Sequence, residues 1–353
     1  MRDLRRYSAL STKLRAMQSR LIPDTAFREM ASCKSTADII RLLSLYPDYR
    51  TIFEGLSPEQ LHREALEQLL LTEQYADFSR LYRFAGVAQR KCLELELLRF
   101  ETVLLKRCLR SLFGHLPPLD LSHFRAFFLK HGHVDFSAVT AAKTLRELAE
   151  LLRPTRFAPL FTELSARPAL TLFDCETGLD LWYFRTLARA AEQQPCASDT
   201  KLLRSFIGTQ ADLLNLRWIR RARLYYQMSP DEIRAILIPL RGKLKRDETE
   251  RFLTAESEEA FMALLGSSAY GPAAARLSSP PDIEQLYTAV LDRLYTHSAR
   301  QHPYSCAVLV RYLRSREAEI RRIISVTEAV RYGLPPEEIV SEILKLDHRR
   351  SLI

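Results

Sequence analysis

The sequence predicts an all-helical protein, and three observations carry that prediction. Glycine is scarce, with 10 in 353 residues, while Leu, Ala, Arg and Glu are abundant. Runs of β-branched residues are confined to short pieces such as "AILI" (235–238) and "CAVLV" (306–310). A short phrase recurs three times at wide spacing. With 47% hydrophobic residues the chain can bury a substantial core.

The recurring phrase reads "LPPLDL" at 116–121, "MSPDEI" at 228–233 and "LPPEEI" at 334–339. Each copy has the composition of a helix start. Ser229 is a suitable N-cap, Pro230 suits the first helical position, and the acids that follow favour the positive end of the helix dipole. We expect Pro117-Pro118 and Pro335-Pro336 to begin helices in the same way.

Two further elements recur with the phrase. A long helix is expected before each copy, in which an acid precedes a base by five residues: Glu101 and Lys106, Asp212 and Arg217, Glu317 and Arg322. A shorter helix ending in Leu-Leu is expected within 27–43, 136–152 and 252–265, with Ser35, Thr144 and Ser257 as its N-caps. The markers repeat at roughly 105 to 113 residues. The sequence therefore predicts three similar helical units, residues 1–114, 115–240 and 241–353, in a closed pseudo-threefold array.

Composition limits the setting of the protein. The six cysteines are widely separated and the N-terminus has no signal-peptide character, so a reducing cytoplasm is expected. The longest uncharged stretch, residues 260–275, contains Gly and Pro and is shorter than the roughly 20 apolar residues that cross a bilayer. Any membrane role should be peripheral. The net charge of +9 is dispersed among acids, which is typical of solvated helix faces, and no specific nucleic-acid binding is expected.

Motifs for chemistry are missing from the sequence. Gly266 and Gly271 lack the Lys-Ser/Thr of a phosphate loop, and His131-Gly132-His133 is interpreted as a polar helix end. Aromatic side chains at helical spacing, Trp182, Tyr183, Phe184, Trp218, Tyr225 and Tyr226, are expected to pack in the core. We therefore expect no catalytic, cofactor or metal site, and no enzyme activity of the chain itself.

The chain resembles the C/d subunit of the rotary V-type and archaeal-type (A-type) ATPases. The resemblance is carried by residues 7–43, 212–233 and 317–339, in the same order over nearly the whole chain, and by the threefold repetition. The acid-x-x-Asn-Leu-Arg core typical of that family is matched by Asp212, Asn215, Leu216 and Arg217. In the third unit Glu319 stands at the Asn position, and "ETVLLKR" (101–107) keeps only the acid and the base.

The resemblance implies a funnel of three helical subdomains on the cytoplasmic face of the membrane, bound peripherally to the proteolipid ring. The tip of the central shaft, made of subunits D and F, would plug into it, so that a monomer within a hetero-oligomeric complex transmits torque. Such a subunit is non-catalytic and holds no cofactor. The choice between proton and sodium transport is expected to reside in other subunits.

Basic residues of the three long helices are the candidate partner interface. They recur in all three units and could steer an acidic partner: Lys106, Arg107, Arg110, Arg217, Arg220, Arg221, Arg223, Arg314, Arg321 and Arg322. The alternative is that these cations face water or pair with acids such as Glu101, Asp212 and Glu319. An alternative function is a cytoplasmic basic helical-repeat scaffold for protein or RNA partners, although such repeats are normally only about 20–50 residues long.

Overall fold

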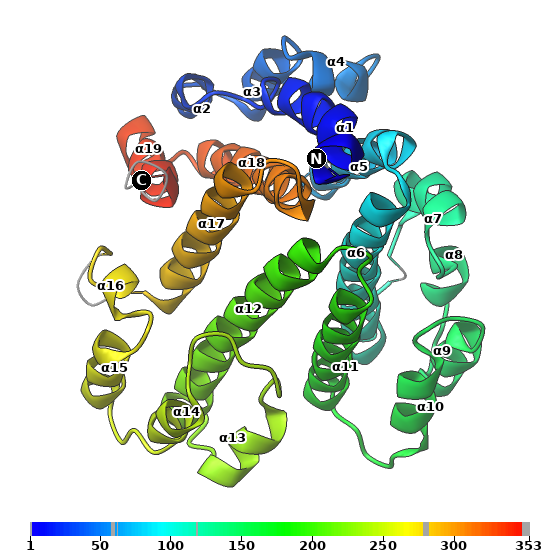
Figure 1. Ribbon diagram of the computed structural model, residues 1–353. Helices are drawn as coiled ribbons and strands as arrows, with labels where there is room; N and C mark the ends of the chain where they lie inside the picture. Colours follow the sequence, from blue (N-terminus) through cyan, green and yellow to red (C-terminus); the bar gives the residue numbers. More distant parts are fainter. Residues whose placement is uncertain (1, 58–60, 62, 118, 278–281, 348–353) are drawn as a thin grey trace. The chain divides into compact units, whose positions relative to one another are not determined.

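The computed structural model describes residues 2–57, 61, 63–117, 119–277 and 282–347. These residues form helices, turns and loops and no strands (Figure 1), which confirms the predicted all-helical class. The chain divides into two compact units: unit 1 comprises Met1–Val87 and Tyr295–Ile353, and unit 2 comprises Ala88–Leu294. We describe each unit by itself. The predicted threefold division stays a prediction.

Unit 1 joins sequence segments from both ends of the chain. Helix α18 packs against α1, α2, α3, α5 and α19. The core of unit 1 contains Phe27, Ile40 and Tyr49 from the N-terminal segment together with Ile320 and Ile323 of α18. The helices of this unit are α1 (Arg2–Gln18), α2 (Asp24–Ala31), α3 (Thr36–Leu43), α4 (Pro47–Phe53), α5 (Arg63–Phe84), α18 (Cys306–Arg331) and α19 (Pro336–Asp347).

Unit 2 alternates long helices with groups of short ones. Helix α11 packs against α10 and α12, and α12 packs against α13, α14 and α15. Helix α6 starts at the unit boundary and α17 crosses into unit 1. The helices are α6 (Val87–Phe113), η2 (Ser122–Phe124), α7 (Arg125–His131), α8 (Phe136–Val139), α9 (Leu145–Leu152), α10 (Ala158–Ala166), α11 (Leu172–Glu192), α12 (Ala197–Leu224), α13 (Pro230–Ile236), α14 (Arg246–Leu253), α15 (Glu258–Ser267), α16 (Gly271–Ala274) and α17 (Ile283–Gln301).

Most of the predicted helix starts are confirmed. Ser35, Thr144 and Ser257 each accept the backbone N–H three residues further on, and Ser229 forms a reciprocal capping box with Glu232. Helix α19 begins at Pro336.

The first copy of the phrase does not begin a helix at Pro117. Leu116, Pro117 and residues 119–121 are not helical, and Pro118 lies outside the described residues. The next helical residue is Ser122, whose N–H donates to the Asp120 carboxylate at 2.9 Å. That acid holds the turn before η2, so the helical segment starts after the phrase and not within it.

Helices α6, α12 and α18 end in the same way. After each, one residue adopts the left-handed conformation: His115 at φ 51°, Gln227 at φ 50° and Gly333 at φ 70°. The residue after it donates its N–H to a carbonyl in the last helical turn: Leu116 to Ser111 at 2.9 Å, Met228 to Ala222 at 3.0 Å, and Leu334 to Ala329 at 3.0 Å. The recurring phrase therefore follows a recurring helix end.

The expected packing of the aromatic residues is correct in part. Tyr183 and Phe184 are buried, whereas Tyr225 and Tyr226 are exposed by 69% and 65%. The prediction for Tyr225 and Tyr226 is wrong because α12 ends at Leu224. The two rings follow the last helical residue, so the helical spacing that placed them on the apolar face of the helix does not apply to them.

Candidate interface residues and buried carboxylates

The candidate cations of α6 contact acids on α11. Lys106 Nζ lies 2.5 Å from an Asp180 oxygen, and Arg110 Nε lies 2.6 Å from a Glu176 oxygen. Arg107 is half-buried and forms no ion pair with a described residue. Two of these three cations therefore connect two helices of unit 2.

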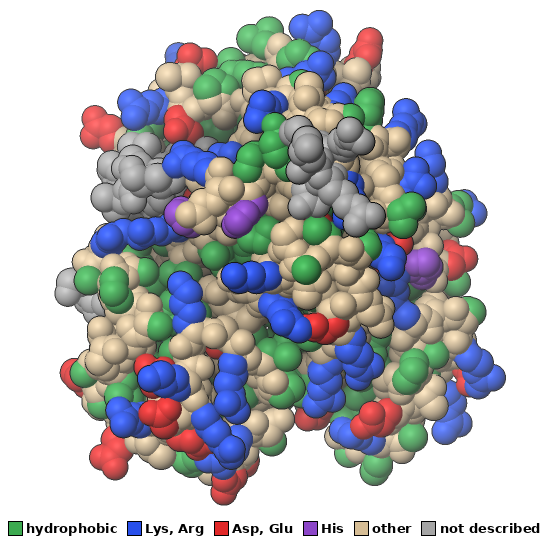
Figure 2. All heavy atoms as spheres, viewed as in Figure 1, with side chains coloured by type: hydrophobic (Ala, Val, Ile, Leu, Met, Phe, Trp, Pro, Cys, Tyr) green, Lys and Arg blue, Asp and Glu red, His purple; other side chains and the backbone are tan. Residues whose placement is uncertain are grey.

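Three of the four candidate cations of α12 are also bonded within unit 2. Arg217 Nη1 lies 2.9 Å from a Glu284 oxygen of α17, and Arg220 donates to Glu258 of α15 at 2.8 Å. Arg223 donates to the backbone carbonyls of Met228 and Ala255, each at 3.3 Å. Arg221 is exposed and has no ion pair among the residues that the structure describes. Figure 2 shows basic and acidic side chains intermixed where α13 and α14 lie.

In α18 the candidate cations divide similarly. Arg314 pairs with Glu317 at 2.9 Å. Arg322 lies 3.1 Å from Asp24 and places its guanidinium 3.7 Å from the centre of the Phe27 ring, which fastens α2 to α18. Arg321 is exposed without an ion pair to a described residue.

The three acids expected to neutralise these cations, Glu101, Asp212 and Glu319, instead accept backbone N–H groups of loops. Asp212 is buried, and its carboxylate accepts the backbone N–H groups of Gly242, Lys243 and Leu244 at 2.9, 2.6 and 3.0 Å. The Tyr270 hydroxyl donates to the same carboxylate at 2.8 Å. Four donors thus satisfy a buried charge without a cation among them.

Glu101 and Glu319 also hold loops, each with a cation nearby: Arg156 lies 3.7 Å from Glu101, and Arg316 lies 2.5 Å from Glu319. Glu101 accepts the N–H of His133 at 2.6 Å, and Glu319 accepts the N–H of Ile22 at 2.5 Å and the Tyr49 hydroxyl at 2.6 Å. Burial raises the pKa of both carboxyls. The acid-to-base spacing selected Glu317 as the third-unit marker, two residues before Glu319. The half-buried side chain of Glu317 pairs instead with Arg314 of the same helix. Glu319 performs the role.

Asn215 fixes a second segment in unit 2. Its amide nitrogen donates to the Ile238 carbonyl at 3.0 Å, and its amide oxygen accepts the Ile238 N–H at 2.9 Å. The side chain therefore replaces a missing backbone partner for the segment after α13. The Asp212 and Asn215 pair, which carried part of the family resemblance, is a structural device that holds residues 238–244 on α12.

Unit 1 buries a cation beside its carboxylate. Arg316 is fully buried and donates to Asp48 at 2.6 Å, to Asp77 at 2.8 Å and to Glu319 at 2.5 Å. The acids come from α4, α5 and α18, so one guanidinium connects three helices. Sequence reasoning missed this cluster. The helical spacing of charges does not show which arginine of α18 is buried. Two of the partners of Arg316, Asp48 and Asp77, lie more than 200 residues away in the sequence.

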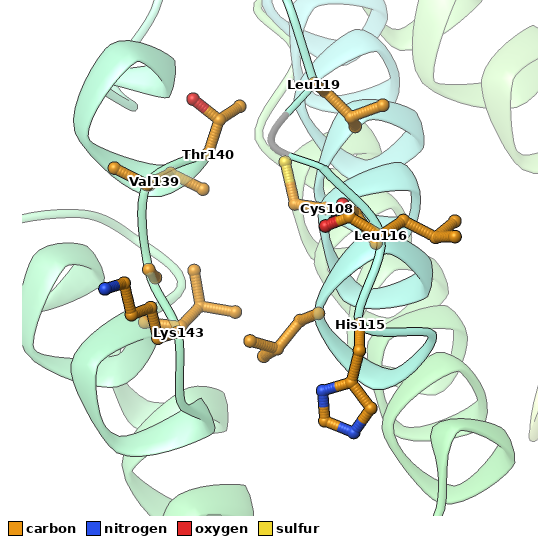
Figure 3. A pocket seen from close by; sticks show the side chains of 12 residues that line it. Cys108, His115, Leu116, Leu119, Val139, Thr140 and Lys143 are labelled. Atoms are coloured by element: carbon orange, nitrogen blue, oxygen red, sulfur yellow. Dashed lines mark hydrogen bonds between the residues drawn. The ribbon is translucent and has the colours of Figure 1, made fainter.

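A cavity of about 370 Å³ lies in unit 2 between the end of α6 and the α8–α9 segment. Figure 3 shows Val139 and Thr140 on one side and Cys108 and Leu116 on the other. Burial raises the pKa of the Cys108 thiol to about 12, so this thiol stays protonated and is a poor nucleophile at neutral pH. The other residues that line the cavity include aliphatic side chains such as Leu112 and Leu148.

The described residues contain no group of three or more His, Cys, Asp or Glu placed to hold a metal ion. Gly132 caps the end of α7, as predicted for His131-Gly132-His133. In the described part of the chain, no helix has the length and apolar character needed to span a bilayer.

The geometry defines a class of protein first: a helical protein whose buried carboxylates hold loops on long helices. Five of its ten candidate interface cations pair with an acid of another helix. Comparison with known families then identifies the group. Residues 10–342 match the family described as ATP synthase (C/AC39) subunit, and the chain belongs to this family of V/A-type ATPase subunits.

Relatives include proteins named as the C subunit of an A-type ATP synthase. That of Thermococcus kodakarensis is 25% identical over 347 residues, covering 96% of this chain and 91% of the relative. That of Pyrococcus horikoshii is 27% identical and covers 94% and 89%. That of Methanosphaera stadtmanae is 21% identical and covers 96% and 87%.

Proposed function

We propose that the chain is the non-catalytic central-stalk subunit of a V/A-type rotary ATPase. It acts as a socket that couples the shaft of subunits D and F to the membrane proteolipid ring, and so transmits torque in proton or sodium ion transport. Its place is peripheral, on the cytoplasmic face of the membrane. The near full-length match to proteins named as the C subunit of an A-type ATP synthase supports this assignment.

The observation that carries the proposal is the recurrence of one local structure on three helices. Glu101, Asp212 and Glu319 each hold the backbone of a following or preceding loop, and each of their helices ends at a left-handed residue. This recurrence supports three units, residues 1–114, 115–240 and 241–353, in a pseudo-threefold funnel. Three equivalent units suit a protein that surrounds a shaft.

A torque coupler must resist deformation more than it must bind a small ligand. Buried carboxylates that hold loop backbones and ion pairs that connect helices supply that resistance. Among the ten candidate interface cations, Arg107, Arg221 and Arg321 have no ion pair to a described residue, so we propose that they contact partners directly. Each of the other seven is bonded to a residue of the same compact unit, either unit 1 (residues 1–87 and 295–353) or unit 2 (residues 88–294), so their replacement should affect stability as well as assembly.

Reconstitution tests the proposal. Purified chain is mixed with the purified D–F shaft and, separately, with detergent-solubilised ring, and complexes are separated by size. The expected result is a stable complex with each. Membranes that lack this subunit should lose ATP-driven ion transport and regain it when the chain is added. Failure to bind both shaft and ring would refute the socket.

The scaffold alternative is addressed in the same preparation. An RNA-binding scaffold of this charge would bind unstructured RNA with an affinity that falls steeply as salt rises. We expect only weak RNA binding that competes poorly with shaft or ring, because the basic residues are mostly paired or scattered. Tight RNA binding together with no binding to shaft or ring would favour the scaffold instead.

A further inference from the structure

A basic loop connects α13 to α14 in unit 2. We define it as residues 239–246, which include the first residue of α14; it carries Arg241, Lys243, Lys245 and Arg246. All four side chains are exposed, and none forms an ion pair with a described residue. This contrasts with the arginines of α12, of which Arg217 and Arg220 are neutralised by acids of unit 2.

The backbone of the basic loop is firmly held. Asp212 accepts three consecutive N–H groups from it, and Asn215 bonds both backbone groups of Ile238 just before it. Gly242 and Gly208 touch: a Cβ added to Gly242 would lie 2.5 Å from the Gly208 carbonyl carbon. Only glycine permits so close an approach of loop to helix.

Like charges carried close together in the sequence on Arg241, Lys243 and Lys245 oppose folding through mutual repulsion. Arg246 interacts with Glu250, but that carboxylate is already paired with Arg234. The arrangement of the loop cations also lowers the entropic cost of binding, since the backbone that carries them is ordered before any partner arrives. Preorganised, unpaired cations are what a charge-complementary interface requires.

We propose that the basic loop docks on an acidic protein surface of the rotary complex; this inference rests on the proposed function. A protein partner fits better than lipid or nucleic acid. Leu244 is buried and Leu240 is half-buried, and the exposed apolar residue of the loop is Pro239, whose small ring is a weak second anchor in a bilayer. It contains no aromatic ring on which a base could stack.

The test is a charge-reversed variant, Arg241→Glu, Lys243→Glu and Arg246→Glu, which leaves Gly242 and Leu244 in place. Its affinity for purified D–F shaft and for purified ring is measured at low and high salt. For one of the two partners, the dissociation constant should rise about tenfold or more at low salt, and the difference should shrink at high salt. The melting temperature should stay close to that of the unaltered chain.

The matched control is Arg185→Glu, Arg189→Glu and Lys201→Glu. These cations are also exposed, lie in unit 2 and have no ion pair with a described residue, and the charge change is the same. The control should bind as the unaltered chain does. If the reversed loop variant fails to fold, Arg241→Gln, Lys243→Gln and Arg246→Gln removes the charge more gently and should still weaken binding several-fold.

The outcomes separate the two proposals. If the unaltered chain binds neither shaft nor ring, the proposed function fails. If it binds them but the loop variants bind as tightly, or the control weakens binding equally, the basic loop is not the interface while the socket stands. If the loop variants lose affinity only for phosphatidylglycerol–phosphatidylcholine vesicles, the loop contacts lipid and the protein partner is refuted.

Discussion

Helices α12 and α18 each bury a carboxylate that holds a loop, but they satisfy its charge differently. Asp212 of α12 is surrounded by three backbone N–H groups and the Tyr270 hydroxyl. Glu319 of α18 receives one backbone N–H, from Ile22, together with the Tyr49 hydroxyl and the guanidinium of Arg316.

The difference shows what happens when backbone donors are few. A carboxylate with three amide donors is stabilised by fixed dipoles and needs no counterion. With one amide donor, Glu319 is paired with a buried cation, and that cation in turn binds Asp48 and Asp77. The α18 solution connects more helices, but it removes more charge from water, which makes it the more vulnerable of the two.

The largest expected effect comes from removing that cation. Arg316→Met leaves Asp48, Asp77 and Glu319 buried without their shared partner, and breaking a buried ion pair costs about 3–5 kcal/mol. Urea unfolding of the full chain should show the loss. Arg314→Met is the control on the same helix, since its pair with Glu317 is partly exposed and should contribute about 1 kcal/mol or less. Equal losses for the two variants would contradict a special role for the buried cluster.

The corresponding change in unit 2 should cost less. Asp212→Asn keeps the shape but offers one acceptor oxygen in place of two charged ones, so we expect a loss of about 2–3 kcal/mol. The effect should be local. Amide hydrogen exchange at Gly242, Lys243 and Leu244 should become much faster than at the caps of α9 and α15. Unchanged exchange in this loop would mean that Asp212 does not hold it.

A pH dependence should come from Glu73, which lies beside the Arg316 cluster of unit 1 because Arg80 pairs with both Glu73 and Asp77. Burial, with Asp77 nearby, raises the pKa of Glu73 from 4.5 to about 7 although Arg80 donates a hydrogen bond to it. Between these values the folded state keeps a proton that the unfolded state releases. The free energy of unfolding therefore falls as the pH rises through this window. Glu73→Gln should remove about 2 kcal/mol of that decline, measured by urea unfolding between pH 5 and pH 8. A slope identical to that of the unaltered chain would exclude Glu73 as its source.

The smallest effects compare the two tyrosines. Tyr49→Phe and Tyr270→Phe each delete one hydroxyl that donates to a buried carboxylate, for about 1 kcal/mol each. Tyr49→Phe should cost more, because its hydroxyl also accepts from Arg316 at 3.3 Å. A larger loss for Tyr270→Phe would reverse the ranking of the two clusters. Thermal unfolding of both variants gives the comparison.

Local signals in the sequence were enough for the fold class and for most helix starts. Ser35, Thr144, Ser257 and Ser229 act through neighbours three residues away, so their roles can be read without tertiary information. The end of α12 could not be placed in this way. Gln227 adopts a left-handed conformation that usually indicates glycine, and the exposure of Tyr225 followed from that missed helix end.

The candidate site was harder to predict because it depends on distant partners. Arg217 and Arg220 looked available in the sequence, and their acids are 67 and 38 residues away. The spacing of acids and bases selected Glu317, whereas burial selects Glu319, and a helical pattern of charges does not say which side faces the core. The boundary predicted between residues 240 and 241 falls within the basic loop. The sequence does not show that this loop is rigid, because its backbone is held by Asp212, which lies about 30 residues earlier.

The composition of unit 1 has a consequence for biosynthesis. Helices α2 to α5 leave the ribosome early, but the helix that covers their apolar faces, α18, is made only after all of unit 2. Unit 2 can therefore fold while the chain is still growing, whereas the first segment must wait with Phe27, Ile40 and Tyr49 uncovered. Nascent chains that stop before Cys306 should be the ones most dependent on chaperones.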